Sequence, residues 1–167
     1  KGRIVEIIRF ATECLAGIPS IIYGLFGGIF FVVTLKLQYS ILSGALTVAI
    51  IILPVIIRTT EEALKTVPNE YREGSLAMGA TKFQTLYKVI LPSALPGILS
   101  GVILSIGRVI GESAAILLTA GTVASMPSSI FDSARTLTVH SYLLTKEMGD
   151  IKGSATVGVV LIIIVLI

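Results

Sequence analysis

The spacing of charged residues constrains this sequence more than any other feature. Within its 167 residues, 22 uncharged residues separate Glu13 from Lys36, and 21 separate Lys36 from Arg58. A helix rises about 1.5 Å per residue, so roughly 20 apolar residues cross the hydrocarbon of a bilayer. Backbone groups in that hydrocarbon must be hydrogen-bonded within their own segment, which makes the crossing segments helices. Each gap is therefore long enough for one transmembrane helix.

The composition agrees with a membrane protein. Hydrophobic residues make up 54% of the sequence and charged residues only 14%, whereas soluble domains carry about 25% charged residues. We expect an all-α bundle with four spans, at residues 18–35, 41–57, 97–118 and 154–167. The sequence starts at Lys1 without an initiator Met and stops within an apolar stretch, so we interpret residues 1–167 as one domain of a longer membrane protein.

The Lys and Arg residues are distributed unequally between the two sides of these spans. Eight lie before the first span or between the second and third: Lys1, Arg3, Arg9, Arg58, Lys65, Arg72, Lys82 and Lys88. Four lie on the other side: Lys36, Arg135, Lys146 and Lys152. Because cytoplasmic loops carry the excess of Lys and Arg, we expect residues 58–96 in the cytoplasm and residues 119–153 outside.

The cytoplasmic segment has the start and stop signals of two helices. Thr59 and Glu62 fit a capping box at the start of the first helix, and Pro68 restarts or bends it. Gly79 fits a left-handed stop. These signals predict an ordered helical hairpin instead of an irregular loop.

The second helix of this hairpin has its own signals. Thr81 and Gln84 fit a second capping box. Pro92 and Pro96 are expected to break this helix before the third span. A capped helix from Lys82 to Leu91 that joins the span directly would act as a rigid lever.

The same segment carries a motif: Glu73-Gly74-Ser75, three residues, Gly79, nine residues, then Val89-Ile90-Leu91-Pro92. It resembles the cytoplasmic signature of ATP-binding-cassette importer permeases, in which Glu-Ala-Ala, three residues, Gly and nine residues precede Ile-x-Leu-Pro. The spacing matches, with Gly74 and Ser75 in place of the alanines and Val89 in place of isoleucine. The resemblance implies the fold of a type I importer permease, and coupling to an ATPase through Glu73, Gly74, Ser75, Gly79, Leu91 and Pro92.

Further stretches resemble the permeases of phosphate importers. These are AGIPSIIYGLFG at residues 16–27 and GRVIGE at residues 107–112. LPGI at residues 95–98 and LLTAG at residues 117–121 are more similar to the A-type subunit of that system than to its C-type partner. The likeness weakens at residues 122–153, where it implies only contact with an extracytoplasmic binding protein.

The resemblance also implies the surroundings of the chain. It predicts a multi-pass protein of the prokaryotic inner membrane, assembled with a homologous second permease, two ATP-binding subunits and a phosphate-binding protein. The sequence has no Gly-x-x-x-x-Gly-Lys-Ser/Thr loop, so we expect ATP and magnesium to be bound by the partner ATPase. We expect no cofactor, no catalysis and no nucleic-acid binding by this chain itself.

Two charged residues lie inside the third predicted span. Arg108 follows Gly97 by 11 residues, which places it roughly 16 Å into a span of about 30 Å. Such a charge costs about 2.5 to 3.5 kcal/mol unless it is buried in protein, paired or hydrated. Arg108 and Glu112 are four residues apart and would share one helix face. Either they form a salt bridge that only helps packing, or Arg108 binds the anion and Glu112 holds Arg108 between transport events.

Other residues favour ordinary structural roles. Glycines four apart are typical of closely packed transmembrane helices, and they occur at Gly24 and Gly28, Gly97 and Gly101, and Gly107 and Gly111. The lone Cys14 and the lone His140 have no partners for a disulfide or a metal site. We interpret both as packing or surface residues.

Two other functions remain open. A permease for sulfate or molybdate would suit Arg108 equally well, because the guanidinium recognises oxyanions in general. A membrane scaffold or sensor that signals phosphate status without conducting it belongs to a different class. Competition between anions separates the first alternative from phosphate transport, and loss of both Arg108 and Glu112 separates the second.

Overall fold

The computed structural model describes residues 2–167, and these residues form helices and connecting segments without a β-strand. The α-helices are α1 (Arg3–Ala16), α2 (Ser20–Gly27), α3 (Ile41–Thr66), α4 (Asn69–Ala77), α5 (Lys82–Thr85), α6 (Leu91–Gly111), α7 (Ala114–Leu117), α8 (Leu137–Lys146) and α9 (Ile151–Leu166). Two π-helical segments, Gly28–Thr34 and Leu86–Ile90, continue α2 and join α5 to α6. The all-α fold class is confirmed.

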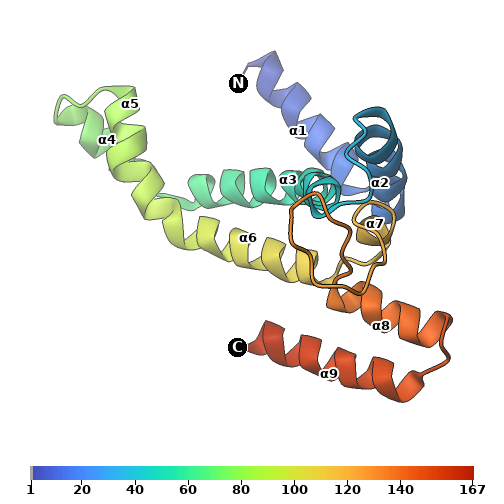
Figure 1. Cartoon of the computed structure of the whole chain (residues 1–167). Helices are drawn as coiled ribbons and strands as arrows, with labels where there is room; N and C mark the ends of the chain where they lie inside the picture. The colour runs from blue at the N-terminus through green and yellow to red at the C-terminus, as the bar shows by residue number, and fades with distance from the viewer. Residues whose placement is uncertain (1) are drawn as a thin grey trace.

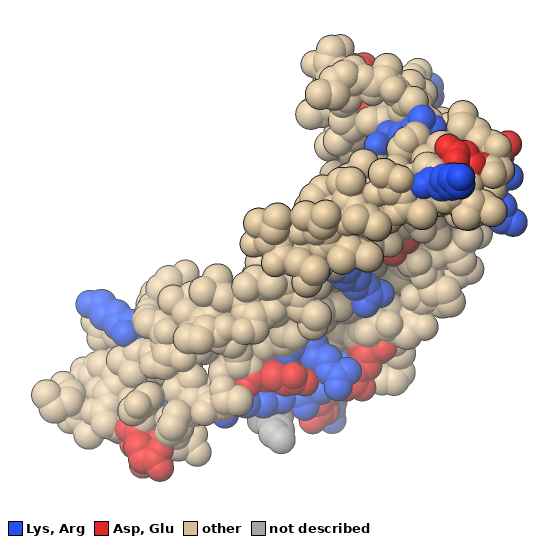
Figure 2. All heavy atoms as spheres, turned by 90° about the horizontal axis from the view of Figure 1, so that it is seen from below, with Lys and Arg blue, Asp and Glu red and all other residues tan. Residues whose placement is uncertain are grey.

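The long helices α3 and α6 lie side by side, with α4 and α5 at one end and α2 and α7 at the other (Figure 1). Two helices are long and apolar enough to cross a membrane: Ile41–Thr66, with 26 residues, and the continuous helix Lys82–Gly111, with 30 residues. Figure 2 shows charged side chains in separate groups, with broad uncharged surface between them along the molecule. This distribution suits a body embedded in lipid.

The first and fourth predicted spans differ from straight crossing helices. Helix α1 and the stretch Ser20–Thr34 meet at 99°, the geometry of a broken span or of a re-entrant loop. Pro19 lies at the bend, where it disfavours a helical conformation for the residue before it. The Arg9 guanidinium forms an ion pair with Glu61 of α3, so α1 lies beside the basic end of α3. The fourth, α9, has 16 residues in this chain and contacts α8.

Small residues bring α3 and α6 together. A Cβ atom at Gly97 would lie 2.8 Å from the Cβ atom of Ala63, and one at Gly101 would lie 2.7 Å from the Cβ atom of Thr59. Glycine at these positions therefore lets the backbones approach more closely than any side chain would allow. The predicted packing role of this glycine pair is confirmed.

The other two glycine pairs differ in whether they pack against another segment. A Cβ atom at Gly24 would lie 2.8 Å from the Cα atom of Ala115, so α2 packs closely on α7. A Cβ atom at Gly28 would likewise lie 3.2 Å from the carbonyl oxygen of Leu118. Within residues 2–167, Cβ atoms at Gly107 and Gly111 would meet no atom within 4 Å. The structure therefore gives this third pair no packing partner in the described chain.

The predicted first capping box is wrong. Helix α3 continues to Thr66, and the Thr59 hydroxyl donates to the carbonyl of Val55 at 2.9 Å instead of capping a new helix. Glu62 pairs with Arg58 at 3.3 Å within the same helix. The helix continues because its packing against α6, through Thr59 and Ala63, extends past residue 58.

The signals around the second cytoplasmic helix are confirmed up to the prolines. Gly79 has φ +83°, and Thr81 and Gln84 exchange both hydrogen bonds of a capping box, at 2.9 and 3.3 Å. The predicted break at Pro92 and Pro96 is wrong, because the helix runs from Lys82 to Gly111. The π-helical turn Leu86–Ile90 places Pro92 in the first turn of α6, where a missing N–H is tolerated.

The third predicted span, residues 97–118, is also interrupted. Helix α6 ends at Gly111, and Glu112 adopts an extended conformation (φ −74°, ψ 125°) before the short helix α7. The segment 119–153, which was predicted to face outward and showed no pattern, contains the helix α8. Thr136 caps α8 by accepting the N–H of Val139 at 3.4 Å.

The loop after α7 closes the first turn of α3. The N–H groups of Ile41 and Leu42 donate to the carbonyls of Asp132 and Ile130, each at 3.0 Å. The Asp132 carboxylate in turn accepts the hydroxyl and N–H of Ser128, both at 2.8 Å, and the N–H of Ser129 at 2.9 Å. These bonds, led by the Ser128 hydroxyl, lower the pKa of Asp132.

This loop is expected to loosen in acid. Because the folded pKa of Asp132 lies below its unfolded value of about 3.9, its contribution to stability is present above that pH and is lost as pH falls through the folded pKa. Asp132→Asn should remove this pH dependence. Hydrogen exchange of residues 128–132 between about pH 3 and 6 measures it. Equal acid sensitivity in both proteins would contradict the assignment.

Candidate functional site

The predicted coupling residues Glu73, Gly74, Ser75 and Gly79 lie on α4 and in the turn that follows it. Glu73 and Gly74 are exposed, and a Cβ atom at Gly74 would meet no atom of the described chain within 4 Å. Large apolar side chains are exposed on the same helix and turn: Tyr71 (53%), Leu76 (43%) and Met78 (89%). An exposed apolar surface rimmed by polar groups is typical of a protein interface.

Polar side chains attach α4 to both long helices. The hydroxyls of Ser75 and Thr85 lie 2.9 Å apart and join α4 to α5. The Arg72 guanidinium donates to the carbonyl of Leu64 near the end of α3, at 3.0 Å. Leu91 and Pro92, the other predicted coupling residues, lie at the start of α6 instead of on the exposed surface of α4. They can therefore act only through the helix that follows α5.

Arg108 lies at the middle depth of the helix pair. The contacts of Gly97 with Ala63 and of Gly101 with Thr59 set the register of α6 on α3. That register, carried along α6, places Arg108 level with Ile52, near the centre of the apolar stretch 41–57. The charge of Arg108 also lies within electrostatic range of the Tyr23 hydroxyl on α2.

The side chain of Arg108 is exposed and, within residues 2–167, forms neither an ion pair nor a hydrogen bond. It belongs to the last turn of α6, where backbone carbonyls lack helical partners. A cation is stabilised at that end of a helix. The arrangement leaves the planar donors of the guanidinium available for a ligand that carries oxygen atoms.

Glu112 has a different role from the one the sequence suggested. Its carboxylate accepts the N–H of Ala115 at 3.2 Å, and its carbonyl accepts the hydroxyl of Thr138 from α8 at 3.0 Å. The described residues show no ion pair between Glu112 and Arg108. The spacing of four predicted a shared helix face, but α6 ends at Gly111 and the chain turns away before Glu112.

Sequence reasoning missed Thr138, which fixes the break between α6 and α7. The hydrogen bond joins residues 26 positions apart, and no periodicity or local motif connects them. Broken helices in membranes are tolerated where other groups satisfy the freed backbone atoms. Only the packing of α8 against this region supplies that group.

The whole chain, residues 1–167, matches the family model described as "Binding-protein-dependent transport system inner membrane component". The probable ABC transporter permease protein YqgI of Bacillus subtilis is 39% identical over 153 residues, which cover 84% of this chain and 52% of that protein. The phosphate transport system permease protein PstA of Mycobacterium leprae is 42% identical over 132 residues, covering 79% and 43%. A PstA homolog of Mycoplasma pneumoniae is 38% identical over 149 residues, covering 85% and 23%.

The chain spans roughly half of the length of the first two relatives, at 52% and 43%. No solved structure matches this chain significantly. The family and the apolar helices place the protein in the inner membrane as a multi-pass protein. The chain therefore belongs to the inner membrane components of binding-protein-dependent transport systems, the permeases of ATP-binding-cassette importers.

Proposed function

We propose that this permease conducts inorganic phosphate and that Arg108 contacts the anion on its way through the membrane. The observation that carries this proposal is an unpaired guanidinium at mid-depth, beside a break in α6. Leaving a charge at that depth costs free energy, so an arginine retained there is expected to have a function. Its bidentate donors match two oxygens of a tetrahedral oxyanion.

The names of several relatives support phosphate among the possible oxyanions. Those from the mycobacteria and mycoplasmas are called phosphate transport permeases, whereas the name of the Bacillus relative states no substrate. A permease for sulfate or molybdate is the second candidate, because a guanidinium alone does not select among these anions.

Uptake by the assembled transporter tests this function. Vesicles would carry the complete complex, with ATP on the cytoplasmic side and the binding protein outside, and labelled phosphate would be supplied. We expect ATP-dependent accumulation that unlabelled phosphate abolishes and that equal concentrations of sulfate or molybdate leave in place. Accumulation of sulfate or molybdate instead would identify the second candidate. ATP hydrolysis without accumulation of any of the three anions would favour a sensor or scaffold.

We also propose that α4 docks on one of two partner ATPase subunits, which bind ATP and magnesium. A homologous second permease and an extracytoplasmic binding protein would complete the assembly. The exposed surface of α4 supports this docking, and so do its links to α3 and α5. The helix Lys82–Gly111, with 30 residues, would carry movement over roughly 39 Å from Lys82 to Arg108.

Gly74→Leu should uncouple the transporter. The space around Gly74 accommodates a Cβ atom, so the chain itself should fold, but a bulky side chain on the docking surface would hold the ATPase away. We expect at least tenfold less ATPase to co-purify with the complex. Thr66→Leu, at an exposed position outside α4, provides the control. Normal co-purification with Gly74→Leu would exclude this face of α4 as the docking surface.

A further inference from the structure

A second group of basic side chains lies on the outward side of the molecule. A cavity of about 240 Å³ is lined by residues 123–126 together with Arg135 and His140. We propose that Arg135 and His140 form an outer binding site for a tetrahedral oxyanion, which the transported anion occupies before it reaches Arg108. The inference rests on the proposed function for the identity of the anion.

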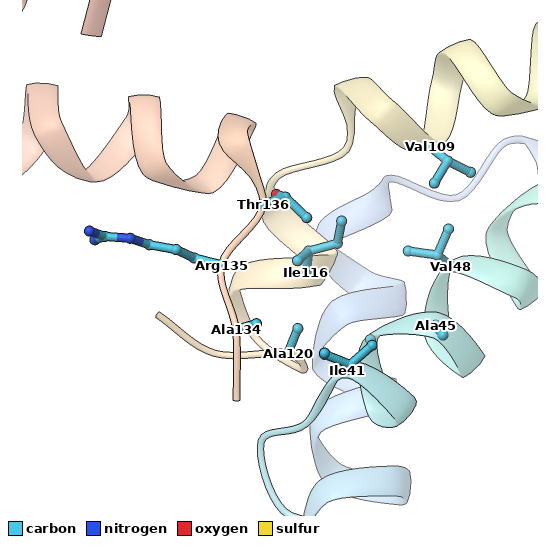
Figure 3. A pocket seen from close by; sticks show the side chains of 10 residues that line it. Ile41, Ala45, Val48, Val109, Ile116, Ala120, Ala134, Arg135 and Thr136 are labelled. Atoms are coloured by element: carbon cyan, nitrogen blue, oxygen red, sulfur yellow. The ribbon is translucent and has the colours of Figure 1, made fainter. Parts of the chain in front are cut away.

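Arg135 is available for a ligand. In the part of the chain that the structure describes, its guanidinium makes no hydrogen bond and no ion pair. The residue also borders a larger apolar cavity that Val48, Val109 and Ile116 help to line. Figure 3 shows the Arg135 side chain pointing away from that apolar cavity. The guanidinium is therefore available to bind a ligand in the smaller cavity that it lines together with His140.

His140 offers a second donor. Its Nδ1 atom is buried without a hydrogen-bond partner. Its Nε2 atom is accessible and makes no hydrogen bond within residues 2–167. With the proton on Nε2, the buried Nδ1 atom carries no hydrogen, so no buried N–H lacks an acceptor. This neutral tautomer donates a hydrogen bond from the accessible side of the ring.

The acidic groups near this cavity are already engaged. The Asp132 carboxylate accepts three hydrogen bonds from Ser128 and Ser129. The Glu112 carboxylate accepts the N–H of Ala115. Neither carboxylate pairs with Arg135 in the described chain, so an incoming anion would not have to displace one from it.

One hydrogen bond links the segment that lines this cavity to the break beside Arg108. Thr138, between Arg135 and His140 in the sequence, donates its hydroxyl to the carbonyl of Glu112. Asp132, three residues before Arg135, accepts the N–H of Ile41, and the level of Arg108 at Ile52 lies roughly 16 Å farther along α3 at the helical rise. Two sites at this spacing allow an anion to pass from one to the next, with each site weak enough to release it.

Chemical protection of His140 tests the outer site directly. It is the single histidine of the 167 residues, so carbethoxylation by diethyl pyrocarbonate, read by peptide-resolved mass spectrometry, reports on this position. The assembled transporter would be treated without the binding protein, at increasing inorganic phosphate and constant ionic strength. We expect phosphate to slow the modification of His140. Arg135→Gln should raise the phosphate concentration for half-protection at least tenfold, Arg135→Lys should raise it less, and Lys146→Gln, on the helix that carries His140, should leave it unchanged.

The outcomes separate this inference from the function on which it rests. Phosphate uptake by the wild type without protection of His140 would overturn the outer site and leave the proposed function intact. Protection by phosphate without phosphate uptake would support the site and overturn the function. Equal protection by chloride would also overturn the site, because it would show a general effect of salt.

Discussion

Replacing Arg108 with Gln in the assembled transporter is expected to lower the maximal rate of phosphate uptake on the order of 10- to 100-fold. The physical reason is the loss of charge-assisted hydrogen bonds to the anion, which contribute about 1.5 to 3 kcal/mol. Arg108→Lys keeps the charge but loses the planar pair of donors, so we expect an intermediate rate. Uptake at saturating binding protein, in vesicles with matched amounts of complex, measures both effects.

Lys88→Gln is the matched control, because Lys88 lies on the same continuous helix at an exposed position outside the apolar stretch. Co-purification of the ATPase subunits shows whether each variant assembles. Unchanged uptake with Arg108→Gln, together with a changed melting temperature, would show that this arginine has only a packing role. Removing a costly intramembrane charge would in that case alter only stability.

Gly101→Ala is expected to destabilise the contact between α3 and α6 by about 1 to 3 kcal/mol, the usual cost of overpacking. The new Cβ atom would lie 2.7 Å from the Cβ atom of Thr59, and a change of the Thr59 rotamer cannot relieve that overlap. One of the two helices must therefore shift. Thermal unfolding of the purified complex, followed by the loss of monodisperse protein, measures the effect.

A compensating change sharpens this test. Thr59→Gly removes the atoms that the new Cβ atom at position 101 would meet, so combining it with Gly101→Ala should recover most of the lost stability. The double variant moves one Cβ atom from α3 to α6 and keeps one glycine in the contact, so helix propensity changes little. Gly158→Ala on α9, where a Cβ atom meets nothing within 4 Å of the described chain, should have little effect. Failure of Thr59→Gly to rescue would show that the packing at Gly101 does not limit stability.

Several local features followed from sequence because adjacent residues alone decide them. The capping box of Thr81 and Gln84 and the left-handed Gly79 depend on neighbours within one turn, and both are confirmed. The close approach at Gly97 and Gly101 is also confirmed, since glycines at that spacing let two apolar helices pack closely. The first part of the motif, Glu73 to Ser75, lies on the short helix α4, whereas Leu91 and Pro92 lie at the start of α6.

Other features failed because a distant segment changed the outcome of a local signal. Thr59 has the sequence of a helix start, but packing of α3 on α6 carries the helix through it. Pro92 has the sequence of a helix stop, but a preceding π-helical turn accommodates it. Glu112 has the spacing of a partner for Arg108, but Thr138 from α8 helps to hold it in a break.

The sequence by itself determined that this chain is a helical membrane permease and where its apolar stretches lie. These properties depend on hydrophobicity and helical rise, which are summed along the chain and need no tertiary contact. Only the tertiary structure decided that the third span breaks after Gly111, that Arg108 is unpaired within the described chain, and that Arg135 and His140 share a cavity. Each of those features depends on whether a distant backbone or side-chain group lies close enough to hydrogen-bond with the atom concerned.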